Sequence, residues 1–371
     1  MRIAPYRPLT VVAAAAVLAL SASACRSHPE GAPSRKPDAF ELQLLQEFAR
    51  LPDSVPARWL GLIGEYGPDT TIRWYALERD RRMYILDQFH NYVPLAEKSD
   101  TVFDAPRSTA LVSGEVRFHK DATGHGISVQ LSDMVMARRN IEPPPGVNQK
   151  RITPVRPVEE LRREALAAKP PTESGNFKTP ALVEVTKLDS TIKLEVRYAT
   201  DNNFLGTKLY EQGRAFLQKP AADALVKAQK VLKPFGYGLL IHDAYRPWYV
   251  TKIFWDATPD SLHWLVANPA EGSKHNRGAA VDLTLYDRET GKSVEMPSTY
   301  DESSDRAHAD YPGGTSLQRW HRQLLRRVME HEGFTVNPNE WWHFDYKDWK
   351  SYPIMNLPFD RIPVLAPVTA K

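Results

Sequence analysis

The feature that most constrains this sequence is an aspartate inside an otherwise apolar run. Residues 279–285 read Ala-Ala-Val-Asp-Leu-Thr-Leu, which predicts a buried strand where the Asp282 carboxylate needs a partner or a metal ion. His275 precedes this run, and Gly278 between them allows a turn before the strand begins. This spacing is compatible with two metal ligands, and equally with a salt bridge from Asp282 to Arg277 or another cation.

A second polar pair, Glu340 and His343, brackets two tryptophans further along the chain. Together the two stretches offer two imidazoles and a carboxylate, a catalytic type of zinc site, because three protein ligands leave one position open for water. Residues three apart in a regular strand face opposite sides, so Glu340 and His343 share a site only if the backbone bends. The Asn-Pro-Asn stretch at residues 337–339 favours such a bend. The alternative is an aromatic strand with two unrelated polar residues.

The N-terminus has the pattern of an export signal. Arg2 and Arg7 precede an apolar core at residues 11–20 that is too short to span a bilayer. Small residues follow, and then Cys25, the only cysteine of the chain. A cysteine at this place resembles a bacterial lipoprotein processing site, so we expect residues 1–25 to direct export to the periplasm or cell envelope, with a lipid anchor on Cys25. Simple cleavage after Ala24 is the alternative.

The composition is that of an ordinary globular protein. The chain has 371 residues, of which 42% are apolar and 25% charged, and this length suits two domains of about 150 residues each. The 48 basic residues nearly balance the 45 acidic ones, without a long basic run, so nothing suggests a nucleic-acid partner. With its single cysteine the chain has no internal disulfide, and its stability must come from packed cores. The oligomeric state is left open.

The chain divides into segments of different pattern. Residues 26–56 read as a tether with a short helix. Residues 57–141 alternate apolar and polar side chains between turn signals, which predicts six to eight antiparallel strands in meander order. Residues 142–178 begin with consecutive prolines and read as a linker containing a short helix. Residues 179–371 contain both alternating segments typical of strands and segments with the apolar spacing of helices, which predicts an α+β domain.

Within that second domain, several elements are expected. Strands are predicted at residues 182–185, 194–198 and 239–241, and helices at 220–233, after Pro247, and around 317–328. Thr315 or Ser316 is the expected cap of the last helix, and Gly333 its terminator. His321, on that helix, is expected to be an ordinary solvated residue.

The motifs taken together resemble a known family. Ser273-x-His275-x-x-Gly278-x-Ala-x-Asp282 with Glu340-x-Trp342-His343 is similar to the signature of zinc D-Ala-D-Ala peptidases, and most of all to the dipeptidases of the vancomycin-resistance type. Shared features such as Tyr245-Arg246-Pro247 extend the resemblance over about residues 180–365. It implies a Hedgehog/DD-peptidase-like zinc domain, preceded here by a small all-β antiparallel meander domain that such dipeptidases are not expected to carry.

The resemblance also implies roles for single residues. One Zn²⁺ per chain would be held by His275, Asp282 and His343. Glu340 would be the general base that takes a proton from metal-activated water and passes it to the leaving amine, and Arg246 would stabilise the oxyanion of the tetrahedral intermediate.

Further positions match those that hold the termini of the dipeptide, namely Tyr198, Ser273 and Asp301. Asp301 would face the ammonium, with Asp305 as the alternative. A carboxylate reserved for a free amine separates a dipeptidase from a carboxypeptidase that acts on longer peptides.

The expected function is therefore zinc-dependent hydrolysis of D-alanyl-D-alanine at the cell wall, by an exported hydrolase bound to the envelope membrane through its N-terminal lipid. One alternative is a D,D- or L,D-carboxypeptidase acting on peptidoglycan peptides. The other is a non-catalytic cell-wall-binding lipoprotein, although a purely structural metal site needs neither Glu340 nor Arg246.

Overall fold

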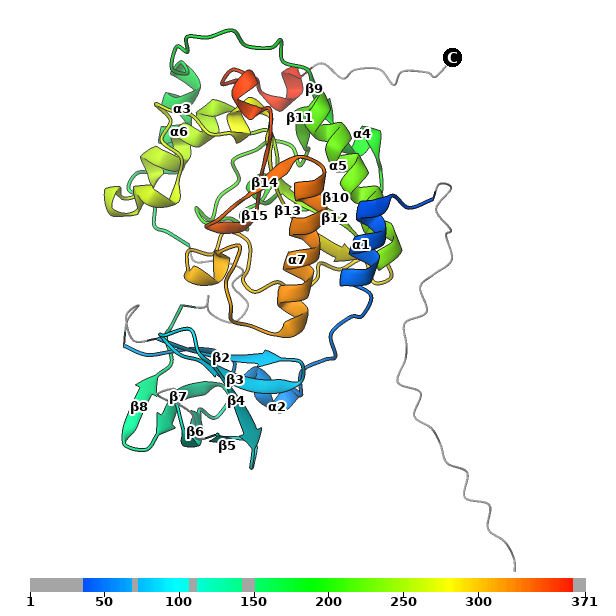
Figure 1. Ribbon diagram of the computed structural model, residues 1–371. Helices are drawn as coiled ribbons and strands as arrows, with labels where there is room; N and C mark the ends of the chain where they lie inside the picture. Colours follow the sequence, from blue (N-terminus) through cyan, green and yellow to red (C-terminus); the bar gives the residue numbers. More distant parts are fainter. Residues whose placement is uncertain (1–35, 69–72, 107–111, 142–150, 363–371) are drawn as a thin grey trace, which may run out of the picture.

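The computed structural model describes residues 36–68, 73–106, 112–141 and 151–362. They form two domains, a β-domain and a larger domain with helices packed around a sheet, so the α+β prediction is confirmed (Figure 1). The signal segment and Cys25 lie outside the described residues, and export and lipidation stay predictions. Across the described ranges, no helix has both the length and the apolar character needed to cross a bilayer.

The β-domain is a single antiparallel meander of eight strands in sequence order, as the alternating pattern predicts. One face of each strand is buried in a core that includes Trp74, Met83, Phe103 and Phe118. A short helix, α2 (Ala57–Leu60), precedes the sheet. The strands are β1 (Gly64–Tyr66), β2 (Trp74–Arg79), β3 (Arg82–Leu86), β4 (Tyr92–Glu97), β5 (Val102–Ala105), β6 (Gly114–Lys120), β7 (Gly126–Leu131) and β8 (Met134–Ala137).

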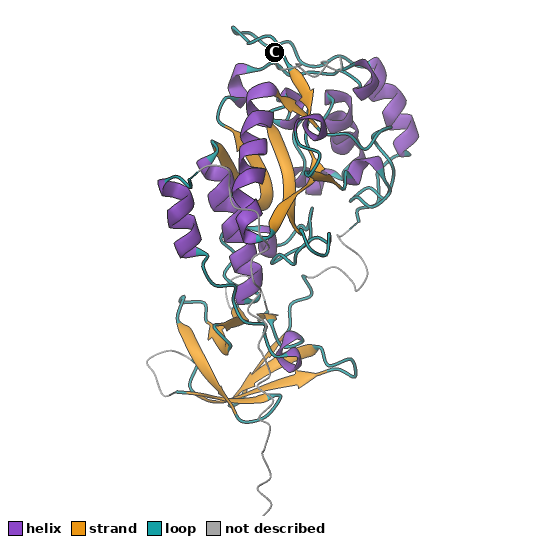
Figure 2. Ribbon diagram, turned by 90° about the vertical axis from the view of Figure 1, so that its right-hand side faces the viewer, coloured by secondary structure: helices purple, strands orange, loops and turns teal. Residues whose placement is uncertain are grey.

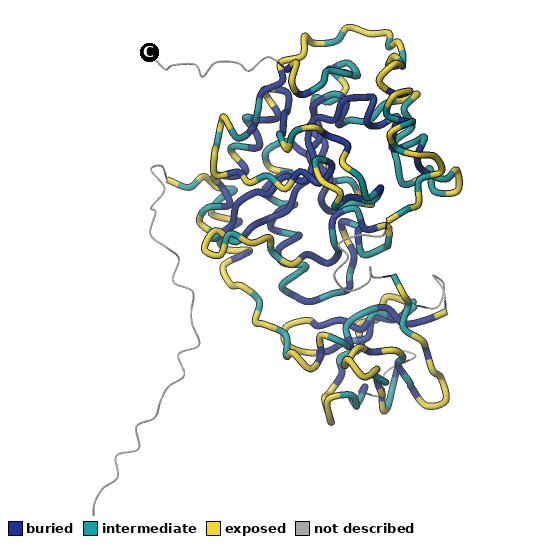
Figure 3. Tube along the Cα trace, turned by 180° about the vertical axis from the view of Figure 1, so that it is seen from behind, coloured by how far each residue is buried: buried dark blue, intermediate teal, exposed yellow. Residues whose placement is uncertain are grey.

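The second domain is built on a five-stranded sheet with the order β10-β12-β13-β15-β14. Only β10 and β12 run parallel, and the other neighbours are antiparallel. The strands are β10 (Lys193–Leu194), β12 (Tyr237–Asp243), β13 (Ala280–Asp287), β15 (Glu340–Tyr346) and β14 (Phe334–Asn337). A two-stranded sheet of β9 (Leu182–Glu184) and β11 (Phe216–Gln218) lies beside it. The central strands are buried almost throughout (Figure 3).

Helices cover both faces of this sheet (Figure 2). One face packs against α1 (Ala39–Glu47), α5 (Lys219–Leu232) and α7 (Ser316–His331), in a core that contains residues of all three helices. The short helix α4 (Val185–Leu188) adjoins α5. On the other side, α3 (Val158–Ala167) and α6 (Trp248–Ala257) pack together in a second core. Asp282 faces this second side, because it alternates with Val281 and Leu283, which point into the first core.

Helix α7 follows its sequence signals closely. Thr315 is the N-cap and forms a capping box with Gln318, which satisfies backbone N–H groups at the helix start. Leu324 and Val328, which belong to its apolar stripe, are buried in the first core. His321, however, is buried rather than solvated, because its ring nitrogens bond to the carbonyl oxygen of Glu295 and the hydroxyl of Tyr237.

Two expected connecting segments belong to the second domain's cores. In the predicted linker, Leu161 and Ala165 of α3 are buried in the core that this helix shares with α6, so this helix packs onto the second domain. In the predicted tether, Leu44 of α1 is fully buried, and the ring of Phe40 stacks on that of His331 at 3.7 Å. The charged residues of α3 hid its apolar stripe, since short charged helices read as solvated.

The strand expected at residues 194–198 is largely absent. Only Lys193–Leu194 pairs with β12, and the chain then forms a 3₁₀ turn at Arg197–Ala199. This turn buries Tyr198 between the sheet and α6, where its ring contacts that of Phe254 at 4.8 Å. The apolar residues of the segment thus reflect burial against a helix, which a short apolar run cannot distinguish from a strand.

Candidate active site

His275 reaches the site from a tight turn that leads into β13. The turn is a 3₁₀ element, His275–Arg277, and Gly278 ends it with a φ of 64°. That left-handed conformation favours glycine, and a Cβ at this position would lie 2.5 Å from Cδ2 of Leu182. The glycine therefore fixes the angle at which His275 precedes the strand.

Strand pairing brings the other two ligand candidates together. Asp282 of β13 lies directly opposite His343 of β15. Nδ1 of His343 is 2.9 Å from Oδ1 of Asp282, and Nε2 of His275 is 3.1 Å from Nδ1 of His343 and 3.3 Å from Oδ1 of Asp282. All three side chains are buried, and their candidate ligand atoms lie within 4.8 Å of one another.

In each imidazole, the nitrogen that points away from the cluster already has a hydrogen-bond partner. Nδ1 of His275 donates to the carbonyl oxygen of Ala244 at 2.7 Å, and Nε2 of His343 donates to Oδ1 of Asp345 at 2.8 Å. In the neutral form with these tautomers, each imidazole would present an unprotonated nitrogen on the side of Asp282. Three lone pairs that converge in a buried site require a cation between them, and this donor set fits zinc.

The pKa values of Asp282 and His343 are both shifted by this arrangement. Burial lowers the pKa of His343, but the hydrogen bonds to Asp282 and Asp345 outweigh burial and raise it to about 10. Burial alone would raise the pKa of Asp282, yet His275 and His343 hold it well below its usual range. Both shifts reflect the close approach of Asp282 to the imidazoles in a buried site.

Glu340 lies beside this cluster because β15 departs from regular pairing at its start. The β14–β15 register runs from Val336 opposite Phe344 directly to Asn337 opposite Glu340, so the strand carries the bend that a shared site requires. Nδ2 of Asn337 donates to Oε2 of Glu340 at 2.9 Å, and that oxygen is 3.9 Å from Nδ1 of His343.

The Glu340 carboxylate is partly exposed and has an altered pKa. Burial raises its pKa, and the His343 charge opposes that rise. Its side chain is 36% exposed, and solvent reduces the size of such shifts. A carboxylate with a raised pKa, beside the candidate ligands and outside the cluster itself, is chemically suited to accept a proton.

Arg246 follows β12 and immediately precedes Pro247, the N-cap of α6. Its Nε and Nη2 donate to Oδ2 of Asp243 at 3.0 and 2.8 Å, and Asp243 in turn accepts from the hydroxyl of Tyr210 at 2.7 Å. The backbone N–H of Arg246 donates to the carbonyl oxygen of His275 at 3.1 Å. Arg246 is only 7% exposed and is therefore held firmly next to the turn that carries His275.

Tyr198 and Asp301 meet although they are far apart in the sequence. The hydroxyl of Tyr198 donates to Oδ2 of Asp301 at 2.8 Å, and the neighbouring Tyr300 donates to Oδ2 of Asp282 at 2.9 Å. Burial, followed by the charge of Asp282, raises the pKa of Asp301 to about 8. A substrate ammonium or a metal ion would oppose both effects.

The remaining two candidates occupy different positions. Ser273 lies in the ligand turn, where its hydroxyl oxygen accepts from the backbone N–H of His275 at 3.2 Å. Asp305, the alternative to Asp301, pairs instead with Arg73 of the β-domain. The geometry therefore favours Asp301 over Asp305 as the carboxylate beside the candidate metal ligands.

Comparison with known proteins shows where this domain belongs. Residues 178–361 match the family model described as D-ala-D-ala dipeptidase. The chain is 36% identical over 177 residues to the D-alanyl-D-alanine dipeptidase of Escherichia coli, a stretch that covers 48% of this chain and 90% of that protein. The chain belongs to the D-Ala-D-Ala dipeptidase family. The family resemblance of the motifs, and the prediction of an enzyme, are thereby confirmed.

Two further members of the family agree. The D-alanyl-D-alanine dipeptidases of Enterococcus faecium and Enterococcus faecalis are 33% and 36% identical to this chain over 180 residues each. Each match covers 44% of this chain and 89% of the relative. The residues matched by the dipeptidase family model begin after the β-domain, so that domain is an addition to the part shared with the family.

Sequence reasoning missed the residues that orient the dipeptidase site. Asp243 holds Arg246, Tyr300 holds Asp282, and Asp345 holds His343. Lys274 forms an ion pair with Asp345, so the positive charge of Lys274 is balanced by the carboxylate that also binds His343. The available signal was the acidic residue two positions after His343, but its partner could be identified only once the strands were paired.

We expect Asp345→Asn to weaken zinc binding about 10–100-fold, because the carboxylate that holds the His343 tautomer is lost. The affinity is measured by competition with a chromophoric chelator. Asp348→Asn is the matched control, since Asp348 follows the same strand but pairs with Lys178 at the surface. Equal zinc affinity in wild type and Asp345→Asn would show that Asp345 does not support the ligand.

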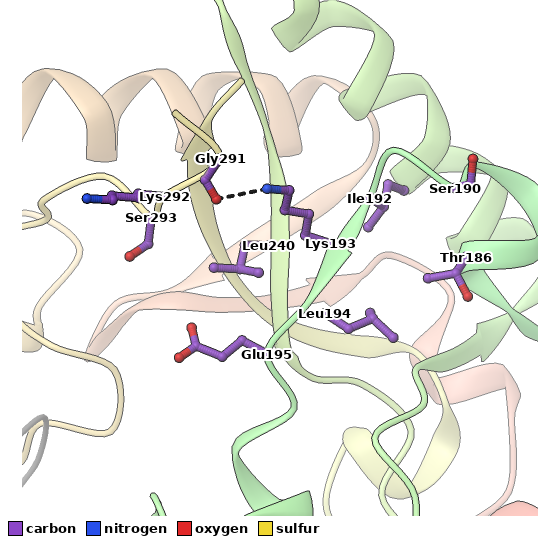
Figure 4. A pocket seen from close by; sticks show the side chains of 10 residues that line it. All are labelled: Thr186, Ser190, Ile192, Lys193, Leu194, Glu195, Leu240, Gly291, Lys292 and Ser293. Carbon is purple, nitrogen blue, oxygen red and sulfur yellow. Dashed lines mark hydrogen bonds between the residues drawn. The ribbon is translucent and has the colours of Figure 1, made fainter. Parts of the chain in front are cut away.

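A separate hollow of about 780 Å³ lies at the β10 edge of the sheet (Figure 4). Its lining contains none of the three candidate zinc ligands, Glu340 or Arg246. Nζ of Lys193 is engaged there by the carbonyl oxygen of Gly291 at 2.8 Å. The hollow is therefore distinct from the dipeptidase site.

Proposed function

We propose that this protein is a zinc-dependent dipeptidase that hydrolyses D-alanyl-D-alanine. The observation that carries the proposal is the convergence of His275, Asp282 and His343 in a buried site, beside the Glu340 carboxylate, which lies outside that cluster. Membership of the D-Ala-D-Ala dipeptidase family supports the substrate. A zinc ion held by these ligands would supply the Lewis acidity that activates water and polarises the amide carbonyl.

Glu340 supplies the proton transfers. Its carboxylate takes a proton from the attacking water and delivers it to the amine that leaves when the peptide bond breaks. The bond from Asn337 fixes one carboxylate oxygen and leaves the other available. Because Glu340 begins β15 and His343 belongs to the same strand, base and ligand keep a constant separation.

Arg246 stabilises the negative charge that develops on the carbonyl oxygen. Its guanidinium is oriented before substrate arrives, since Asp243 binds it through two nitrogens and the ring of Phe254 lies 4.7 Å from its central carbon. A donor that is already oriented in a buried site stabilises charge without further reorganisation.

Asp301 and Tyr198 recognise the free amine of the substrate. The ammonium would pair with a carboxylate that burial otherwise makes costly to ionise, and the Tyr198 hydroxyl keeps that carboxylate in place. This contact makes the site selective for a dipeptide, because a longer peptide presents a neutral amide at the same position.

The test compares D-Ala-D-Ala with its N-acetyl derivative in zinc-loaded protein. We expect kcat/KM to be about 10⁴-fold lower for the blocked compound, because acetylation removes the positive charge of the amine and leaves the buried Asp301 carboxylate without its ammonium partner. Equal hydrolysis of both would instead support a carboxypeptidase. Hydrolysis of neither, with one zinc bound, would support a non-catalytic binding protein.

A further inference from the structure

The hairpin of β2 and β3 in the β-domain contacts the start of α7 (Figure 1). Oε2 of Glu78 accepts from the backbone N–H of Ser316 at 2.7 Å, which places a carboxylate at the positive end of the helix. The backbone of Glu78 also donates to the carbonyl oxygen of Gly314 at 3.2 Å and accepts from Nη2 of Arg319 at 2.6 Å. These bonds fix the C-terminal end of the loop that joins β13 to α7.

A second contact lies further back in the same loop. Arg73, just before β2, forms an ion pair with Asp305. Its guanidinium is also 3.5 Å from Oε2 of Glu65, a carboxylate that is only 1% exposed and that binds Arg139 at 2.6 Å. Arg73 therefore belongs to a charge network of the β-domain that includes the buried Glu65, and it also connects this network to the loop through its ion pair with Asp305.

The aromatic side chains reinforce this junction. The Arg73 guanidinium lies 4.9 Å from the ring centre of Tyr75, and the Tyr75 ring meets that of Tyr311 edge to face at 5.7 Å. Asp305 and Tyr311 thus fasten one loop to the β-domain at two places.

The fastened loop carries the amine-binding carboxylate. Asp301 lies four positions before Asp305 and has a φ of 58°, a left-handed conformation that is costly for a residue other than glycine. Such a conformation persists only where the surroundings hold it. Tyr198 holds its side chain, and the described contacts of Asp305 hold the chain that follows.

We propose that the β-domain is a positioning element of the active site, and that Arg73 is a positioning residue that holds Asp301 through Asp305. This inference rests on the proposed function, in which Asp301 receives the substrate ammonium. Without Arg73 the loop samples other conformations, and the dipeptide binds only the fraction of molecules in which the amine site is formed.

The experiment measures kcat and KM for D-Ala-D-Ala in zinc-loaded full-length variants. We expect Arg73→Ala and Asp305→Ala each to raise KM about tenfold, the effect of one lost charge-assisted hydrogen bond, with kcat within about twofold. KM rises alone because the ammonium contact exists equally in ground and transition states. Arg73→Lys keeps the charge and should bring KM to within about threefold of wild type.

Two controls match these changes. Arg58→Ala removes an Arg–Glu pair inside the β-domain, and Asp310→Ala removes an exposed carboxylate of the same loop. Neither should change KM. In the Asp301→Asn background, Arg73→Ala should add no further rise, because both changes remove the same interaction.

If Arg73→Ala fails to fold with Glu65 left beside Arg139 alone, Asp305→Ala decides, since it leaves the β-domain network intact. Unchanged KM in a folded Asp305→Ala protein would overturn the inference. It would also be overturned if kcat fell in proportion to the fraction of folded protein while KM stayed the same, because the change would then act on stability alone. A wild-type protein that does not hydrolyse the dipeptide would overturn the proposed function instead.

Hydrogen exchange then tests the inference separately. The backbone amides of residues 298–311 should exchange at least tenfold faster in Asp305→Ala than in Asp310→Ala, and equal exchange rates would contradict the inference.

Discussion

Replacing Glu340 with glutamine is expected to lower kcat for D-Ala-D-Ala about 10²–10⁴-fold, the usual contribution of a positioned general base. Glutamine keeps the size of the side chain, and its carbonyl oxygen can still accept from Nδ2 of Asn337. Only the capacity to accept and return a proton is lost. Zinc content should therefore remain at about one per chain, and KM should stay close to that of wild type.

The measurement pairs steady-state kinetics with metal analysis of the same preparation. Glu330→Gln is the matched control, because Glu330 lies on α7 in a half-exposed pair with Arg326, away from the cluster. It should keep full activity. A Glu340→Gln protein that retains more than about a tenth of the wild-type kcat would remove Glu340 as the base.

The second large effect is expected from Asp282→Asn, which should abolish zinc binding and, with it, hydrolysis. The amide carries no charge to balance the metal ion, and the bond from the Tyr300 hydroxyl to Oδ2 is weakened or lost. Wild-type protein should gain about 2.7 kcal/mol of unfolding free energy when free zinc is 100 times Kd, since zinc binds only the folded chain. The variant should gain almost none.

Thermal unfolding with and without zinc, together with metal content, checks this expectation. Asp223→Asn is the control, because Asp223 forms an exposed pair with Lys219 on α5. It should show the same zinc-dependent stabilisation as wild type. One zinc per chain in the Asp282→Asn protein would contradict the assignment of Asp282 as a ligand.

Much of the fold could be predicted because it follows local patterns. The meander of the β-domain comes from strict alternation between turn residues, and α7 from its cap, stripe and terminator. The prediction failed where burial depended on a distant partner. Leu161 of α3 and Leu44 of α1 lie in segments that looked like linkers, and the tertiary structure buries both.

The candidate site divides in the same way. Gly278, the apolar strand around Asp282 and the Asn-Pro-Asn bend before Glu340 indicated which side chains could converge. Their orientation needed the paired strands, because the carbonyl oxygen of Ala244 and the carboxylate of Asp345 decide which imidazole nitrogens face the metal position.

The sequence by itself therefore determined the donor types, the bend that lets them share a site, and the family to which the domain belongs, since these depend on short spacings. Only the tertiary structure decided how the β-domain bears on the site. Arg73 and Asp305 are 232 positions apart, and no local pattern signals a contact of that range. The strained backbone of Asp301 likewise becomes visible only in the folded chain, where surrounding contacts hold a conformation that its own sequence disfavours.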